Sequence, residues 1–465
     1  MNKLKFDSGS YRDPAGSVFF ENKKVYRNIT NFGSKKYEFI KESGLLEESI
    51  KQGFVIDTKE VNDQNLKNQL PDSKYIIEHK KIDYISYPYE WCFYQLKDAA
   101  IHHLDFQIFL LKNNAILEDC SAYNIQFIES KPIFIDVLSI NKYHEGMYWN
   151  GHKQFCENFL NPLLLSSKKN IFFNNWFKGN LEGIFTSDLN SVLSLKDKFS
   201  LNVFLQVYLL DKLENRIIQN PKKTASKLKK IKPFPKNSYM SLLVQLKKMI
   251  GKLFPYKQKT VWDTYSSNNT YNKEETSFKI QVVKKFIQEN SFNTIADMGC
   301  NDGLYSFESL KSGCENVIGF DFDLNSVNRA YLKAKENNSS FLPLYLDAVN
   351  PSSNLGWNEN ERASFKKRIN FDGMIALAFE HHLTIAKNIP LDQTLEWLTS
   401  LAPKGLIEFV PKEDETIQRM IALKGDIFPN YSEDKFKQLL EKKAKIVKIQ
   451  NISSTKRKMY EYSRD

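Results

Sequence analysis

A leading acid, two glycines and an asparagine stand close together near residue 300, in an order that can hold a nucleotide-like ligand. Asp297 closes a short apolar run, Gly299 and Gly303 follow it, and Asn301 lies between the glycines. Such glycines let the backbone turn tightly from a strand into a helix and let that helix approach a ligand closely. A helix N-terminus at this point commonly receives a pyrophosphate. The acid at the strand end, Asp297, suits a cationic ligand better than a phosphate.

Two further acids follow at the ends of later apolar runs, Asp321 in VIGFD and Asp347 in LYLDA. With the glycine turn and the block FDGMIALAFEHHL, they resemble the motifs of class I S-adenosylmethionine-dependent methyltransferases, in the variant with Asn in place of the middle glycine. The resemblance implies that Asp321 holds the ribose hydroxyls and that Asp347 lies near the adenine amine. A nicotinamide or other nucleotide site and a purely structural turn are the alternatives. The predicted cofactor-binding residues are Asp297, Gly299, Asn301, Gly303, Asp321 and Asp347.

Two adjacent histidines, His381 and His382, come just past the predicted fourth strand, at the carboxyl edge where open α/β sheets bind ligands. Methyl transfer is an in-line displacement at a sulfonium, so a dry, aligned site does most of the work. A hydroxyl acceptor must also lose its proton, and histidine is the natural base near neutral pH. Glu380 and Glu408 belong to the same edge. We predict His381, His382 and Glu408 as catalytic; one histidine would be structural, and transfer by proximity alone stays open.

A second group of polar residues lies in the N-terminal half. Asp119 follows a long apolar helix, Asn124 comes five residues later, and Asp136 closes the strand IFIDV after a turn. This order resembles the catalytic and metal-binding loops of protein-kinase-like and aminoglycoside-type phosphotransferases. The resemblance implies that Asp119 is the base and that Asn124 and Asp136 hold magnesium on the phosphates of ATP.

The N-terminal half departs from that pattern in several places. Leu117 stands where a histidine is usual, Leu138 replaces the usual glycine, and no G-x-G-x-x-G loop precedes them. Arg27 falls where a phosphate-pairing lysine is expected. Capped loop carboxylates in an ordinary α+β domain are therefore the alternative interpretation.

Hydrophobic periodicity predicts how these residues are positioned. Residues 91–111 have the spacing of an amphipathic helix. From residue 277 onward, helical and strand periods alternate as in a βαβ series, which predicts an α/β fold with a Rossmann-like, seven-stranded methyltransferase sheet. The predicted strands are Thr294–Met298, Asn316–Phe320, Leu342–Leu346, Asp372–Leu377, Gly405–Val410 and a closing antiparallel pair, Ala444–Ile449 with Lys458–Tyr462. We predict three parts: a kinase-like α+β acceptor-binding domain (1–215), a basic linker or helical bridge (216–276) and the methyltransferase domain (277–465).

Composition narrows the class of protein. With 42 % hydrophobic and 13 % aromatic residues the chain is globular material, and no apolar run reaches the length of a membrane span. The five cysteines lack metal spacing, and the N-terminus lacks a secretory signal, so a cytoplasmic protein is expected. The net charge of +11 is partly concentrated in the seven lysines of Lys222–Lys236. That run lacks base-stacking aromatics, so no nucleic acid is expected; contact with an anionic surface is open.

Over nearly its whole length the chain is also similar to a bacterial family of methyltransferases related to a rhizobial host-specific nodulation protein. The blocks that carry this similarity include SYPYEW, DCSAYNIQF, DMGCNDG and IEFVPK. We predict an S-adenosylmethionine-dependent methyltransferase, with O-methylation of a glycan, glycolipid or related small molecule as its reaction. One alternative is a bifunctional kinase-methyltransferase acting on one polysaccharide acceptor with Mg-ATP. The other is a non-catalytic scaffold with a degenerate methyltransferase fold.

Overall fold

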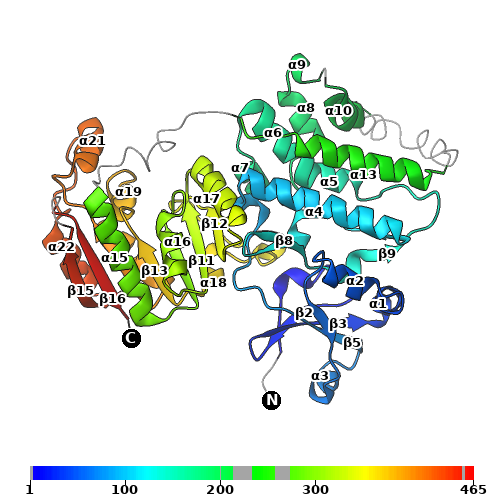
Figure 1. Ribbon diagram of the computed structural model, residues 1–465, viewed down its shortest axis with the longest axis horizontal. Helices are drawn as coiled ribbons and strands as arrows, with labels where there is room; N and C mark the ends of the chain where they lie inside the picture. The colour runs from blue at the N-terminus through cyan, green and yellow to red at the C-terminus, as the bar shows by residue number, and fades with distance from the viewer. Residues whose placement is uncertain (1–3, 199, 213–232, 257–272, 453–455, 465) are drawn as a thin grey trace.

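The computed structural model of the protein describes residues 4–198, 200–212, 233–256, 273–452 and 456–464. We refer to residues 4–256 as the N-terminal half and to residues 273–464 as the C-terminal half; the two lie side by side (Figure 1). Most of the lysine run, residues 222–232, lies outside the described residues, so its contact with an anionic surface stays a prediction. Within the described part of the chain, the model contains no helix that is long and apolar enough to cross a membrane.

The N-terminal half begins with a five-stranded antiparallel sheet in the order β1-β2-β3-β5-β4. The β2–β3 hairpin turns at Asn22 and Lys23, whose positive φ angles match the two-residue turn that suits the twist of a hairpin. Helices α1 and α2 follow β3 in the chain, and α3 lies between β4 and β5. The bounds are β1 Lys5–Phe6, β2 Val18–Glu21, β3 Lys24–Thr30, β4 Thr58–Glu60, β5 Ser73–His79, α1 Asn31–Glu42, α2 Leu45–Lys51 and α3 Gln64–Gln69.

A mostly helical part follows, built around α4 (Phe93–Lys112) as the apolar spacing of residues 91–111 predicts. Two small antiparallel pairs, β6–β9 and β7–β8, follow α4. Helix α13 packs against α4, and the Tyr239 hydroxyl accepts a hydrogen bond from the Gln107 amide at 2.8 Å. Part of the predicted linker thus belongs to the core of this half. The remaining bounds are η2 Pro88–Glu90, β6 Ala115–Leu117, β7 Ile125–Ile128, β8 Lys131–Phe134, β9 Ile140–Lys142, α5 His152–Phe155, α6 Asn161–Lys169, α7 Asn174–Gly179, α8 Thr186–Val192, α9 Leu195–Lys198, α10 Leu201–Val203 and α13 Lys236–Gly251.

The C-terminal half contains a seven-stranded sheet in the order β12-β11-β10-β13-β14-β16-β15. Strands β10 to β14 are parallel, and β16 enters antiparallel between β14 and β15. The predicted α/β sheet with its closing antiparallel pair is confirmed. The bounds are β10 Thr294–Met298, β11 Asn316–Asp321, β12 Phe341–Tyr345, β13 Gly373–Ala376, β14 Lys404–Phe409, β15 Lys445–Asn451 and β16 Lys458–Ser463.

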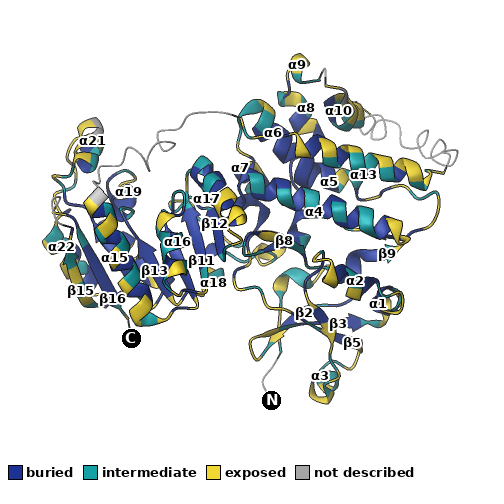
Figure 2. Ribbon diagram, viewed as in Figure 1, coloured by how far each residue is buried: buried dark blue, intermediate teal, exposed yellow. Residues whose placement is uncertain are grey.

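Helices cover both faces of this sheet, and all its strands except the edge strand β15 are buried along most of their length (Figure 2). On one face α15 and α16 pack over side chains such as Ile295 and Val317. On the other face α20 and α22 pack over side chains such as Ala296 and Ile407. Burial on both faces explains the near-continuous apolar runs of the strands. The helix bounds are α15 Lys273–Asn290, α16 Leu304–Lys311, α17 Leu324–Glu336, α18 Phe365–Arg368, α19 Glu380–Thr384, α20 Leu391–Leu401, α21 Glu415–Lys424 and α22 Glu433–Glu441.

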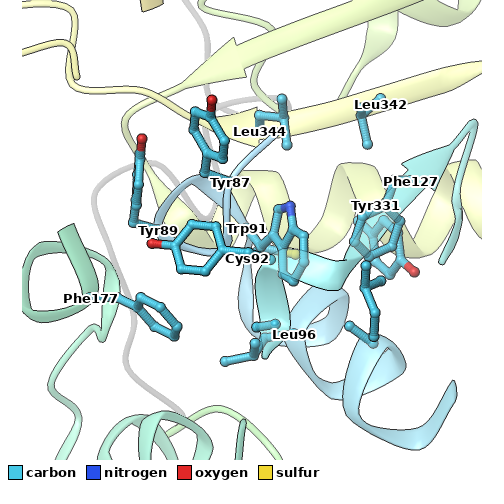
Figure 3. Packing of buried hydrophobic residues seen from close by; sticks show 14 of the residues in the cluster. Tyr87, Tyr89, Trp91, Cys92, Leu96, Phe127, Phe177, Tyr331, Leu342 and Leu344 are labelled. Atoms are coloured by element: carbon cyan, nitrogen blue, oxygen red, sulfur yellow. The ribbon is translucent and has the colours of Figure 1, made fainter. Parts of the chain in front are cut away.

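The apolar core runs without interruption from one half into the other. Figure 3 shows Trp91 and Phe127 of the N-terminal half beside Tyr331 of α17, together with Leu342 and Leu344 of β12. The rings of Phe127 and Tyr331 meet edge to face, with centroids 6.0 Å apart. The N-terminal half therefore packs on the outer edge of the sheet, where β12 has no other strand beside it.

A buried ion pair adds to this interface. Arg368, at the end of the loop between β12 and β13, donates to the Glu90 carboxylate at 2.5 and 2.9 Å, and both side chains are almost fully buried. Its guanidinium also lies over the rings of Tyr84 and Tyr87. Because a buried charge is tolerated only when it is paired, this contact fixes the loop of one half to the other.

Candidate active site of the C-terminal half

The glycine turn follows β10 directly and has the backbone geometry that glycine permits. Gly299 and Gly303 have φ angles of +77° and +92°, and the Gly299 N–H donates to the Phe320 carbonyl at 2.8 Å. A Cβ at Gly299 would lie 2.8 Å from the Phe379 ring, and one at Gly303 would lie 2.5 Å from the Phe341 ring. Neither position accepts a side chain, so the loop lies tightly against its neighbours at the start of α16.

The leading acid is buried at the end of β10. Asp297 accepts a hydrogen bond from the Ser306 hydroxyl of α16 at 2.5 Å. Burial raises the pKa of Asp297 to about 7, although the Ser306 hydrogen bond lowers it; the nearby Asp321 raises it further. The site thus concentrates negative charge that a cationic ligand would stabilise.

Asp321 stands at the end of β11, on the other side of the turn. Its two oxygens accept hydrogen bonds from the backbone N–H groups of Asn301 and Asp323, each at 2.8 Å. Burial raises the pKa of Asp321 to about 6, against the lowering effect of these bonds. Each carboxylate oxygen has a further lone pair, so Asp321 is oriented by the turn and is still able to accept from a ligand.

Asp347 follows β12 by two residues. Its carboxylate accepts from the Val349 N–H at 3.1 Å, and its side chain lines a hollow shared with residues of the N-terminal half. The turn, Asp321 and Asp347 therefore lie at the carboxyl ends of three adjacent parallel strands, β10, β11 and β12. Sulfonium, ribose and adenine groups fit this series of acids beside a tight glycine turn.

The two histidines are the first residues after Glu380 in α19, the short helix that follows β13. Their ring centroids lie 4.3 Å apart. His381 is 1 % exposed, and neither of its ring nitrogens has a hydrogen-bond partner. Burial lowers the pKa of His381 well below its usual value and the pKa of His382 to about 4. Both imidazoles are thus neutral at physiological pH, which is the form that accepts a proton.

Glu408 does not have the surroundings that a catalytic acid or base needs. Its side chain is 0 % exposed at the end of β14, 2.6 Å from the Lys279 ammonium and 3.5 Å from the Arg457 guanidinium. Arg457 in turn pairs with Asp414 at 2.7 Å. A carboxylate held by two buried cations serves as a structural ion pair. We therefore propose no catalytic role for Glu408 and leave it out of the chemistry.

Glu380, the other acid placed at this edge, is also internal. The Tyr431 hydroxyl donates to its carboxyl group at 2.5 Å, and Thr384 contacts it at 3.4 Å. Burial raises the pKa of Glu380 to about 8, so this carboxyl is mainly protonated at neutral pH. Ser306, Lys279, Arg457 and Tyr431 were not identified from the sequence. Their partners are 9 to 129 residues away in the chain, and no local motif marks them.

In the N-terminal half, Asp136 forms an ion pair with Arg27 and is therefore not available as a metal ligand. Arg27 of β3 donates to Asp136 at 2.5 Å and also pairs with Asp13. The other oxygen of Asp136 accepts from Ser139 at 2.5 Å. Burial raises the pKa of Asp136, but these partners outweigh it and leave the pKa below its usual value.

The other two residues of the predicted phosphotransfer site both precede β7. Asp119 accepts from the Gln154 amide at 2.7 Å, and Asn124, which ends the turn before β7, has a buried amide nitrogen without a partner. The described residues contain no group of three or more histidine, cysteine or acidic side chains that could hold a metal ion. Magnesium-bound ATP does not fit Asp136 in this arrangement, because a guanidinium occupies the position that a cation would need.

The sheet order and the site after its central strand define the class of protein. A parallel sheet closed by an antiparallel last strand, with a glycine turn after β10 and acids after β11 and β12, is the arrangement of class I methyltransferases. The chain is an enzyme of this class, and S-adenosylmethionine is its cofactor.

Comparison with known proteins identifies the family. Over 458 residues the chain is 40 % identical to nodulation protein NoeA of Rhizobium meliloti (strain 1021), a match that covers 98 % of this chain and 96 % of that protein. The chain belongs to the NoeA family. A shorter match, 39 % identical over 59 residues, links 12 % of the chain to 20 % of ribosomal protein L11 methyltransferase from Colwellia psychrerythraea. No family model matches the chain.

Two solved structures also align with about two fifths of the chain. N-methyltransferase NodS from Bradyrhizobium japonicum WM9, in complex with S-adenosyl-L-homocysteine, aligns with a TM-score of 0.32 at 11 % identity, over 43 % of this chain and 92 % of its own. Magnesium protoporphyrin IX methyltransferase from Synechocystis PCC 6803 aligns with a TM-score of 0.30 at 18 % identity, over 44 % of this chain and 93 % of its own.

Proposed function

We propose that the protein transfers the methyl group of S-adenosylmethionine to a hydroxyl oxygen of a glycan, glycolipid or related small molecule. The observation that carries this proposal is the presence of acids and neutral histidines at the same edge of the sheet. Asp297 and Asp321 lie at the glycine turn, and His381 and His382 follow the neighbouring strand β13. The name of the relative, a nodulation protein, supports a role connected with nodulation.

The proposed cofactor site follows the order of the strands. Asp321 would accept from the ribose hydroxyls, and Asp347 would accept from the adenine amine. The turn of Gly299, Asn301 and Gly303, with Asp297 beneath it, would hold the methionine end. S-adenosylmethionine supplies a methyl group activated by a positively charged sulfur. Because that charge disappears during transfer, the residues of the site need only to align the reactants and exclude water.

A neutral histidine would complete the reaction by taking the proton of the acceptor. The hydroxyl oxygen forms a bond to the methyl carbon while the carbon–sulfur bond breaks, and the hydroxyl proton passes to an imidazole nitrogen. We assign this role to His382, because His381 is the more deeply buried of the two. His381 would then position the His382 ring through the contact between the two rings.

We further propose that the N-terminal half is a degenerate kinase-like domain that selects the acceptor. Support comes from its five-stranded antiparallel sheet with the order β1-β2-β3-β5-β4, followed by α4 and by hairpin β7–β8. Asp119 and Asn124 precede that hairpin and Asp136 follows it. The pairing of Arg27 with Asp136 disfavours phosphoryl transfer, and hence the bifunctional alternative. We place the boundary of this domain after α13, at residue 256, in place of residue 215.

Titration calorimetry with S-adenosylmethionine and with its demethylated product S-adenosylhomocysteine tests the cofactor. We expect binding of both; absence of binding would favour the scaffold alternative. Incubation of cofactor carrying a labelled methyl group with glycan and lipid fractions of the source organism then tests the acceptor. Label in a base-stable ether would support O-methylation, whereas label only in protein would contradict it. A parallel titration with Mg-ATP, for which we expect no binding, tests the N-terminal half.

A further inference from the structure

A hollow lies at the junction of the two halves, directly beside Asp347. Tyr89, Asn174 and Lys178 line it from the N-terminal half, and Asp347 and Asn350 line it from the loop after β12. Tyr89 is labelled in Figure 3, where it lies between the N-terminal helices and the sheet. In the hollow, residues of the N-terminal half therefore lie beside Asp347, at the adenine end of the proposed cofactor site.

Two of its side chains carry buried polar atoms without a partner. Tyr89 is 3 % exposed and Asn174 is 2 % exposed, and neither the Tyr89 hydroxyl nor the Asn174 Oδ1 makes a hydrogen bond. The orientation of the Asn174 amide is fixed, because its nitrogen donates to the carbonyls of Tyr89 and Trp91, both at 2.9 Å. An unsatisfied buried donor or acceptor is unfavourable and calls for an explanation such as a bound ligand.

The third side chain connects the hollow to the loop that carries Asp347. Lys178 of α7 donates to the Asn350 carbonyl at 2.9 Å. Burial lowers the pKa of Lys178, and Asp347 and Glu90 oppose that shift. Lys178 therefore acts electrostatically on Asp347 while it holds the turn that follows it.

We propose that the N-terminal half completes the adenine pocket of the methyltransferase, with Tyr89 and Asn174 reading the edge of the base and Lys178 holding the turn after Asp347. The proposal rests on the proposed function, since it takes Asp347 as the adenine contact. Chemistry supports it: the edge of adenine offers an amine donor and ring-nitrogen acceptors side by side, and a hydroxyl donor with two oxygen acceptors is the complement.

The position of the hollow favours the cofactor over the methyl acceptor as its occupant. His381 and His382 follow β13, and the order β12-β11-β10-β13 puts three inter-strand spacings between that strand and β12. At roughly 4.8 Å per spacing the two strand ends are about 14 Å apart. A hydroxyl that receives the methyl group must lie at the histidine end, whereas adenine must lie at the Asp347 end.

The test is a calorimetric titration of the full chain with S-adenosylhomocysteine and, separately, with adenosine. Tyr89→Phe removes only a hydroxyl without a partner, so the unliganded variant should be at least as stable to heat as the wild type. We expect it to bind both ligands about 5- to 30-fold more weakly. Tyr143→Phe is the matched control, since the Tyr143 hydroxyl is also buried but does not line the hollow. It should bind both ligands as the wild type does.

Lys178→Met should also weaken both ligands, and exposed Lys168→Met should not. Equal affinity of Tyr89→Phe and wild type for S-adenosylhomocysteine would overturn the inference and leave the proposed function standing. A loss for S-adenosylhomocysteine without a loss for adenosine would overturn it too, because Tyr89 would then contact the amino-acid end. If the wild type binds neither ligand, the proposed function itself fails.

Discussion

Lys279 of α15 donates to Glu408 of β14 at 2.6 Å, although both side chains are almost completely shielded from water. Charges in such surroundings stabilise the fold only when they are paired, because no water can replace a lost partner. The pair joins the first helix of the C-terminal half to the middle of its sheet. Burial lowers the pKa of Lys279, and Glu408 is the main group that opposes this shift.

Lys279→Met should therefore destabilise the protein strongly, by about 3–5 kcal/mol, since it removes the nearer of the two cations that pair with the buried Glu408 carboxylate. Lys285→Met is the control on the same helix, because Lys285 pairs with Glu289 at the surface and such pairs contribute roughly 0–1 kcal/mol. Urea unfolding of both variants, followed by circular dichroism, measures the difference. Equal midpoints would show that the buried pair contributes no more than the exposed one.

Asp321→Ala should weaken binding of S-adenosylmethionine by roughly 1.5–3 kcal/mol, the scale of hydrogen bonds to a charged group. The same change also frees the Asn301 N–H of the turn, which now donates to Asp321. Asp392→Ala, at an exposed position in the first turn of α20, is the control. Calorimetry gives the dissociation constants, and an unchanged value for Asp321→Ala would mean that the ribose lies elsewhere.

Affinity for S-adenosylmethionine should depend on pH. The pKa values of Asp297 and Asp321 are raised to about 7 and about 6 in the unliganded protein. Below these values the carboxyls are protonated, so a cationic ligand binds less tightly and releases protons when it binds. We expect affinity to rise between pH 5.5 and pH 7.5 and then to level off. The rise should be smaller for S-adenosylhomocysteine, which lacks the sulfonium charge; identical profiles for the two ligands would argue against this electrostatic role.

The stability of the unliganded protein should change with pH in the opposite sense. The pKa of Glu380 is raised to about 8, and the pKa values of Asp297 and Asp321 are raised too. Between their ordinary and their raised pKa values, the folded state therefore binds more protons than the unfolded state. The stability that these protonated carboxyl groups contribute is present at low pH. It is lost as pH rises from about 4 toward their pKa values in the folded state. Glu380→Gln should therefore reduce the loss of melting temperature between pH 5.5 and pH 8.5. An unaltered pH profile would mean that Glu380 is ionised throughout this range.

Arg368→Met should loosen the contact between the halves. It removes the partner of buried Glu90 and should cost about 3–5 kcal/mol, as breaking a buried pair does. Because the pair lies between the halves, we expect limited proteolysis to separate the two halves faster in this variant. Arg419→Met, in an exposed pair with Glu415 on α21, is the control. Equal cleavage rates would show that the apolar interface alone holds the halves together.

The sequence predicts the C-terminal sheet closely, and for a physical reason. The predicted strand Thr294–Met298 has the bounds of β10 itself, and the other strands differ by one or two residues. Strands buried on both faces are near-continuous apolar runs, and the glycines of the turn stand where positive φ angles require them. Because Asp297, Asp321 and the histidines stand at or just after the ends of predicted parallel strands, their positions in the sequence predict that they lie at one edge of the sheet.

The remaining features depend on contacts between residues that are far apart in the chain. Glu408 has the position of a catalytic residue, but Lys279 lies 129 residues away and neutralises it. Asp136 has the position of a metal ligand, but Arg27, 109 residues away, occupies it. Local spacing carries no information about such partners. Helix α13 shows the same limit, because its packing against α4 cannot be read from its basic surroundings.

The loop between β12 and β13 has two fixed ends. Near its start, Lys178 of the N-terminal half donates to the carbonyl of Asn350, three residues after Asp347, and near its end Arg368 pairs with Glu90 of the same half. A rotation of one half against the other therefore has to move Asp347 as well. Cofactor affinity would then depend on the angle between the halves. An acceptor that tilts the N-terminal half on binding would change the affinity for the adenine group. Binding and release of the acceptor would in this way control when the product of the cofactor leaves and a new cofactor molecule binds.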